Sequence, residues 1–145
     1  MTTKEWSHLP NAAHIDWVLD TLEKDSEMWG IARGAAGAAA RADARAAARA
    51  DARAAARGAT WDAARAAVWD AVWAAARGAT WDDAWRAGWS AVWDAVAALI
   101  AWGISGELLD KSVEEVTELA KAGDYDAVLM LSAVIVKNKL KNKNT

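Results

Sequence analysis

The stretch RGATWDAARAAVWDAVWAAARGATWDDAWRAGWSAVW, residues 57–93, decides the fold. Its large side chains recur every four residues, and alanine fills most of the positions between them. Alanine is the best helix former, and residues four apart stack on neighbouring turns, so the stretch predicts α-helix and excludes strand. The residues in this frame are Trp61, Trp69, Trp73, Trp81, Trp85, Trp89 and Trp93, with Arg41, Arg45, Arg49, Arg53, Arg57, Arg65 and Arg77.

The four-residue period does not match the helical turn. Four residues advance by about 400°, so the ladder of large side chains drifts around the helix by about 40° per step. An unbroken helix over residues 31–102 would be about 108 Å long, far beyond the radius of gyration of about 15 Å of a compact domain of this size. We therefore expect at least one break.

Two interpretations of the Gly-Ala-Thr triplets at 58–60 and 78–80 stay open. In the first, each glycine ends a helix and the following threonine caps the next one. In the second, glycine is a small residue that permits close helix contact, and the helix continues. Thr80 and Asp83 resemble a capping box, so 78–80 is the expected break.

Both flanks of the repeat also predict helices. Ser112 and Glu115 form a capping box for a helix that Gly123 stops. Residues 127–136 are apolar on all sides and predict a buried helix, because no second strand is available to pair with them. The tail from residue 138 to 145 is expected to fray.

The chain as a whole is predicted to be one all-α domain, residues 1–145, built as a bundle of long alanine-rich helices with a C-terminal helical pair. Residues 1–30 form the N-terminal helix, 31–102 the repeat helices, and 103–145 the C-terminal helices and a basic tail. Asn11 is expected to cap the first helix. The apolar stripe of that helix consists of Ile15, Val18, Leu19 and Leu22.

Composition narrows the classes of function. The 145 residues are 54% hydrophobic and contain no cysteine, so disulfides, thiolate metal sites and a cysteine nucleophile are excluded. The N-terminal MTTKEWSHLP lacks a signal pattern, and no run approaches the roughly 18 apolar residues of a membrane span. We expect a soluble, cytoplasmic protein.

No catalytic or metal-binding pattern stands out. His8 and His14 are the only histidines, and no cysteines or clustered carboxylates accompany them. The sequence has no nucleophile elbow and no glycine-rich phosphate loop. The aspartates of the tetrads are expected to be solvent-facing partners for arginine. The sequence therefore predicts neither an enzyme nor a cofactor.

The ladder of arginine and tryptophan is the candidate binding feature. Residues 31–57 contain six arginines and two aspartates, a net charge of +4. Arginine binds phosphate in a bidentate manner and tryptophan offers a stacking platform, the combination that a nucleotide needs. The alternative is that these side chains pack at helix crossings. Packing is the favoured interpretation from Trp81 to Trp93, whereas from Arg49 to Trp73 packing and ligand binding are about equally favoured. The candidate site residues are Arg49, Arg53, Arg57, Trp61, Arg65, Trp69 and Trp73.

Three segments also carry a resemblance. LPNAAHIDWVL (9–19), WDAARAAVWDAVWAAAR (61–77) and LLDKSVEEVTELAKAGDYDAVLMLSAVIV (108–136) resemble small Ala/Trp/Arg tetrad-repeat proteins of bacteriophages and bacteria. The resemblance covers most of the chain. It implies a phage or prophage accessory setting and nothing about catalytic residues.

These observations lead to a ranked expectation of function. The first is a non-enzymatic, homo-oligomeric binding protein that interferes with host machinery or immunity by binding a host protein or an anionic, nucleotide-like small molecule. The second is nucleic-acid binding through Arg41 to Arg57 and the lysine-rich tail. The third is a structural protein that assembles with copies of itself.

Overall fold

A computed structural model describes residues 6–56, 58–75 and 83–143. Over these residues the chain forms α-helices, one 3₁₀ helix and no strand, which confirms the predicted all-α bundle. The elements are α1 (Ala12–Lys24), α2 (Ser26–Gly37), α3 (Ala42–Ala55), α4 (Gly58–Ala75), α5 (Asp83–Ala101), η1 (Ser105–Asp110), α6 (Val113–Lys121) and α7 (Tyr125–Lys143).

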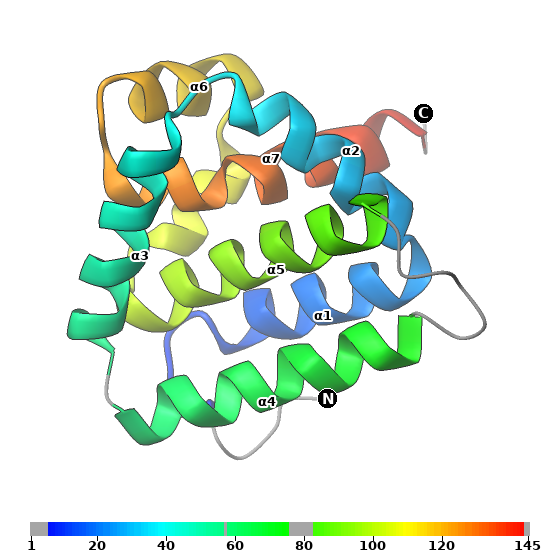
Figure 1. Cartoon of the computed structure of the whole chain (residues 1–145), viewed down its shortest axis with the longest axis vertical. Helices are drawn as coiled ribbons and strands as arrows, with labels where there is room; N and C mark the ends of the chain where they lie inside the picture. Colours follow the sequence, from blue (N-terminus) through cyan, green and yellow to red (C-terminus); the bar gives the residue numbers. More distant parts are fainter. Residues whose placement is uncertain (1–5, 57, 76–82, 144–145) are drawn as a thin grey trace.

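Helices α5 and α7 form the centre of the bundle. Helix α5 packs against α1, α2, α3, α4 and α7, and α7 also contacts α2, α3, α6 and η1. In Figure 1, α5 crosses the middle of the molecule, α1 and α4 lie on one side of it, and α3 runs across at one end. Every residue from 127 to 136 is buried, as the apolar run predicted. Among the described helices, none is long and apolar enough to cross a bilayer.

The C-terminal helices begin and end largely where the sequence predicts. The Ser112 hydroxyl accepts a hydrogen bond of 3.1 Å from the backbone N–H of Glu115 and so caps α6. Gly123 adopts φ of +90°, the left-handed conformation that glycine takes without steric penalty, and reverses the chain after α6. The expected fraying is wrong for residues 138–143, because α7 continues to Lys143.

Asn11 precedes α1 as predicted but does not cap it with its side chain. Its amide Nδ2 instead donates to the carbonyl oxygens of Leu99 and Trp102, at 3.1 and 3.0 Å. Leu99 lies in the last turn of α5 and Trp102 directly follows that helix, where carbonyl groups have no donor from the helix itself. Asn11 therefore ties the start of α1 to the end of α5.

The repeat segment is broken, as its length required, and one break lies at Ala56, just before the first triplet. Helix α3 ends at Ala55 and Ala56 is extended, with φ of −83° and ψ of 144°. Helix α4 begins at Gly58 itself, so Thr60 lies inside the first turn and is not a cap. The triplet at 78–80 lies outside the described residues. A further break between α2 and α3, at residues 38–41, was not predicted, and α2 runs through the boundary expected after residue 30.

Candidate functional site

The tryptophans of α4 turn progressively out of the core. Trp61 is 6% exposed, whereas Trp69 and Trp73 are 43% and 48% exposed. The 40° drift of the frame accounts for this gradient, because Trp69 is rotated by about 80° and Trp73 by about 120° from Trp61. The ladder therefore divides into a packing end and an accessible end.

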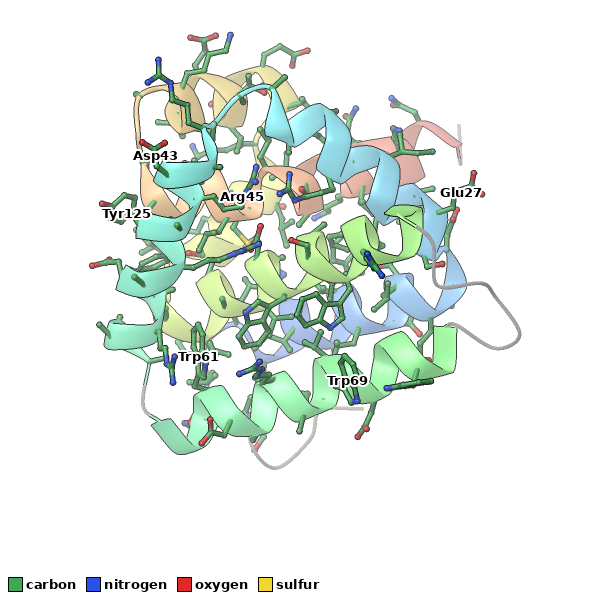
Figure 2. All side chains as sticks on the ribbon, in the orientation of Figure 1. Glu27, Asp43, Arg45, Trp61, Trp69 and Tyr125 are labelled. Atoms are coloured by element: carbon green, nitrogen blue, oxygen red, sulfur yellow. The ribbon has the colours of Figure 1, made fainter. Side chains whose placement is uncertain are left out.

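Trp61 is a core residue. Its ring meets the edge of Trp93 of α5 with centroids 4.8 Å apart and planes at 79°. Figure 2 shows Trp61 directed from the first turn of α4 towards the bundle. The pair fixes α4 against α5, so Trp61 stabilises the site without being available to a ligand.

The accessible end of the ladder borders a groove of about 490 Å³ between α4 and α5. Its volume falls within the range of small-molecule sites. Helix α4 supplies one wall, since residues at spacings of three, four and seven share a helix face. We call this the indole groove, and its lining residues are Asp62, Arg65, Ala66, Trp69 and Trp89.

Two tryptophans form a corner in the indole groove. The rings of Trp69 and Trp89 have centroids 6.3 Å apart and planes at 89°. Trp73 extends this arrangement, because its ring meets Trp69 edge-on at 5.8 Å. The buried Nε1 of Trp89 has no hydrogen-bond partner. A planar molecule on the exposed face of Trp69 would thus meet aromatic surface on a second side.

The charges of the groove come from α4. Arg65 and Asp62 line it one turn apart, and both are exposed. No ion pair joins either side chain to another described residue. The groove therefore offers an uncommitted cation and an uncommitted carboxylate beside the indoles.

The arginines of α3 do not form one continuous surface. Arg41 and Arg53 are exposed, whereas Arg45 is buried. In Figure 2, Arg45 reaches from α3 towards the interior, and Asp43 points outward. Arg49 lies between these extremes: its Nε is 2.5 Å from Asp94 Oδ1, and its Nη2 donates to the Ser90 hydroxyl at 2.8 Å.

Of the seven predicted site residues, the structure brings Arg65 and Trp69 together in the groove, with Trp73 against Trp69. Trp61 faces the core. Arg49 and Arg53 lie on α3, on either side of a shallow surface depression of about 440 Å³. Arg57 lies outside the described residues, as do the side chains of Trp81 and Trp85.

The expectation that the tetrad aspartates face solvent is wrong for Asp94. This carboxylate is 2% exposed, in the middle of α5. Burial raises the pKa of Asp94, and the hydrogen bond from Arg49 and the charges of Arg49, Arg45 and Arg33 lower it to a smaller extent. Burial also lowers the pKa of Arg45, with the Arg33 charge acting in the same direction. For both Asp94 and Arg45, burial is therefore the main cause of the shifted pKa, and the opposite charge of the partner opposes it.

Sequence reasoning missed Trp89 and Asp62 as groove residues and Asp94 as a buried ion. Trp89 belongs to the part of the repeat where packing was favoured, and nothing in the period distinguishes it. A signal for Asp94 does exist, because it is the only charged residue between Arg86 and Glu107, in the apolar segment that becomes the core of α5.

No group of three or more His, Asp or Glu side chains that could hold a metal ion occurs among the described residues. Comparison of the chain with protein-family models, with curated proteins and with solved structures gave no match.

Proposed function

We propose that this chain is a non-enzymatic binding protein that takes a small aromatic anion of the nucleotide class in the indole groove. The observation that carries the proposal is the corner of Trp69 and Trp89 with Arg65 one turn away from Trp69. One turn separates the two side chains by about 6 Å along the helix axis. A base on the indole and a phosphate on the guanidinium can be held at the same time.

Each group of the groove has a matching part of a nucleotide. A base stacks on the face of Trp69, which is accessible to solvent. Arg65 has no ion pair with a described residue, so its fork of N–H donors is available to phosphate oxygens. Asp62 accepts hydrogen bonds from ribose hydroxyls or an exocyclic amine, which gives a carboxylate a role beside an anionic ligand.

The arrangement of α3 supports this ligand class over a nucleic-acid strand. A strand would need a continuous row of cations along the helix. Of the described arginines of that helix, Arg45 is turned inward and Arg49 is paired with Asp94. A compact anion needs only the single cation of the indole groove.

The biological setting follows from the resemblance to tetrad-repeat proteins of bacteriophages. In that setting the protein interferes with host machinery or immunity by sequestering a nucleotide signal. Exposed indoles also favour self-association, so homo-oligomerisation through Trp69 and Trp73 accompanies the proposal. Light scattering of the free and ligand-bound protein distinguishes self-association through these rings from ligand binding by them.

The test is calorimetric titration with AMP and adenosine, alongside quenching of tryptophan fluorescence. We expect AMP to bind more tightly than adenosine, because only AMP engages Arg65 through a phosphate. Trp69→Ala removes the stacking platform, and since stacking contributes about 1–3 kcal/mol per base, the affinity for AMP should fall at least about fivefold. Trp69→Phe should restore part of it.

A matched pair of charge variants completes the design. Arg65→Gln should weaken AMP binding and leave adenosine binding unchanged. Arg53→Gln makes the same charge change on an exposed residue of α3 and should alter neither. The proposal fails if AMP at millimolar concentration gives neither heat nor quenching, or if Trp69→Ala binds AMP as tightly as the unmodified chain.

A further inference from the structure

Three guanidinium groups converge between α2, α3 and α5, away from the indole groove. Arg33 comes from α2 and Arg45 and Arg49 from α3; we call these three residues the arginine cluster. Among the described residues, the only carboxylate paired with it is Asp94 of α5, 2.5 Å from Arg49 Nε and 3.6 Å from Arg45 Nε. Trp89 lines the indole groove, whereas its neighbour Ser90 contacts Arg49, so α5 presents two different faces to the two sites.

The arginine cluster carries more positive charge than the protein neutralises. In the described part of the chain, Asp94 is the carboxylate that pairs with Arg45 and Arg49, and no carboxylate pairs with Arg33, so one anion accompanies three cations. The negative end of the α2 dipole, equivalent to roughly half a charge, offsets part of the remainder. More than one positive charge stays uncompensated at a place where Arg45 is only 8% exposed.

Hydrogen bonding at the cluster is also incomplete. The Nε of Arg33 is buried and has no hydrogen-bond partner. A buried donor without an acceptor is rare in native proteins, and on a guanidinium it is costly. Asp94 does not serve Arg33, because its two oxygens are directed at Arg49 and Arg45. The missing component is therefore an acceptor that carries negative charge.

The cluster has an open approach at the end of α2. Gly37, the last residue of that helix, is exposed. A Cβ at this position would lie 3.3 Å from Arg33 Nη1 and 4.0 Å from Arg45 Nη2, so a terminal nitrogen of each guanidinium group lies next to this exposed backbone position. An anion arriving there meets N–H donors from two arginines.

We infer that the arginine cluster is a second binding site, distinct from the indole groove, for a tetrahedral oxyanion of the phosphate class that enters beside Gly37. Arginine recognises this class because its planar fork of donors matches two oxygens at once. The anion supplies the acceptor that Arg33 Nε lacks and the charge that Asp94 alone does not provide. Its binding fastens α2, α3 and α5 together.

The test is thermal unfolding in inorganic phosphate and in chloride at equal ionic strength. Saturating phosphate should raise the Tm by about 5 °C over chloride, because it binds only the folded chain. Arg33→Leu should abolish this rise and also raise the Tm in chloride, since it removes a partly buried cation whose Nε has no acceptor. Arg53→Leu, the same change on an exposed arginine of α3, should keep the rise.

A second pair of variants tests the point of entry without removing an arginine. Gly37→Glu places a tethered carboxylate beside the arginine cluster, and Gly37→Gln is its neutral match. The Glu variant should have the higher Tm in chloride and no response to phosphate, whereas the Gln variant should fall below it in chloride. Equal Tm values in chloride for the two variants would contradict the site.

Two further measurements identify the source of the phosphate group and distinguish this site from the indole groove. A larger rise with ribose 5-phosphate than with inorganic phosphate supports a phosphorylated metabolite, and an equal or smaller rise supports the free ion. Trp69→Ala should keep the full phosphate response, whether or not the indole groove binds nucleotides. The inference is overturned if phosphate raises the Tm no more than chloride, or raises it equally in Arg33→Leu.

Discussion

Replacing Asp94 with asparagine removes the one carboxylate that faces the arginine cluster while keeping the shape of the side chain. The side chain of Asp94 is 3% exposed, and those of its partners Arg45 and Arg49 are 10% and 37% exposed. After the substitution Arg49 can turn towards water, but Arg45 cannot. The variant therefore leaves one buried cation with no counter-ion.

The expected loss of stability follows from that geometry. Breaking a buried ion pair by removing one partner costs about 3–5 kcal/mol. Because Arg49 can relax into solvent, we expect the lower end, a loss of about 3 kcal/mol in the free energy of unfolding. A domain of this size has about 5–15 kcal/mol in total, so the variant should still fold.

The assay is urea unfolding, followed by both tryptophan fluorescence and far-ultraviolet circular dichroism. Asp62→Asn makes the same chemical change on an exposed residue and should shift the free energy of unfolding by less than about 0.5 kcal/mol. The double variant Arg45→Met with Asp94→Leu should recover most of the loss, since apolar replacement of a buried pair is often neutral or stabilising. A loss below about 1 kcal/mol in Asp94→Asn, or a double variant less stable than the single one, would refute this account of the cluster.

Two further predictions concern the start of α7 and the ladder of α4. Burial, with the neighbouring Asp124, raises the pKa of Asp126 to about 6, above the unfolded value of about 3.9. Its protonated form favours the folded state, so the stability that Asp126 contributes is full below pH 4 and is lost as the pH rises through 6. Because Asp126 is partly exposed, we expect a loss on the order of 1 kcal/mol in the free energy of unfolding, and Asp126→Asn should remove this pH dependence. Urea unfolding of both proteins at pH 4.5 and pH 7 measures it. Midpoints that change in parallel in the two proteins would contradict the role of Asp126. In the ladder, Trp61→Ala should lower the free energy of unfolding by about 3–5 kcal/mol and Trp73→Ala by less than about 1 kcal/mol, and equal losses in chemical denaturation would contradict the division of the ladder.

Most of the helices could be predicted from the sequence because the patterns that indicate them are local. Alanine content and the period of four predicted α4 and α5, and the hydroxyl of Ser112 caps α6 as its spacing to Glu115 indicated. The positions where the repeat helices end could not be predicted in the same way. Residues 38–41 and Ala56 leave the helix in alanine-rich surroundings, and the adjoining helices α2 and α3 pack against α5 and α7 through contacts that the repeat does not encode.

The candidate site was predictable in part. The drift of 40° per step implied that the large side chains could not share one environment, and Trp61 and Trp69 illustrate that difference. The direction of the drift relative to the core depends on how α4 packs against α5, which the repeat does not encode. For the same reason Asp94 was expected in solvent but is buried, and Trp89 entered the groove only through the three-dimensional arrangement.

The most direct test of the central claim is the affinity of the Trp69→Ala variant for AMP, measured by calorimetry beside the unmodified chain. The indole groove predicts that AMP binds the unmodified chain and that the variant binds it at least about fivefold more weakly, while both unfold in urea at similar midpoints. Equal affinities in the two proteins would show that the ligand does not use the corner formed by Trp69 and Trp89.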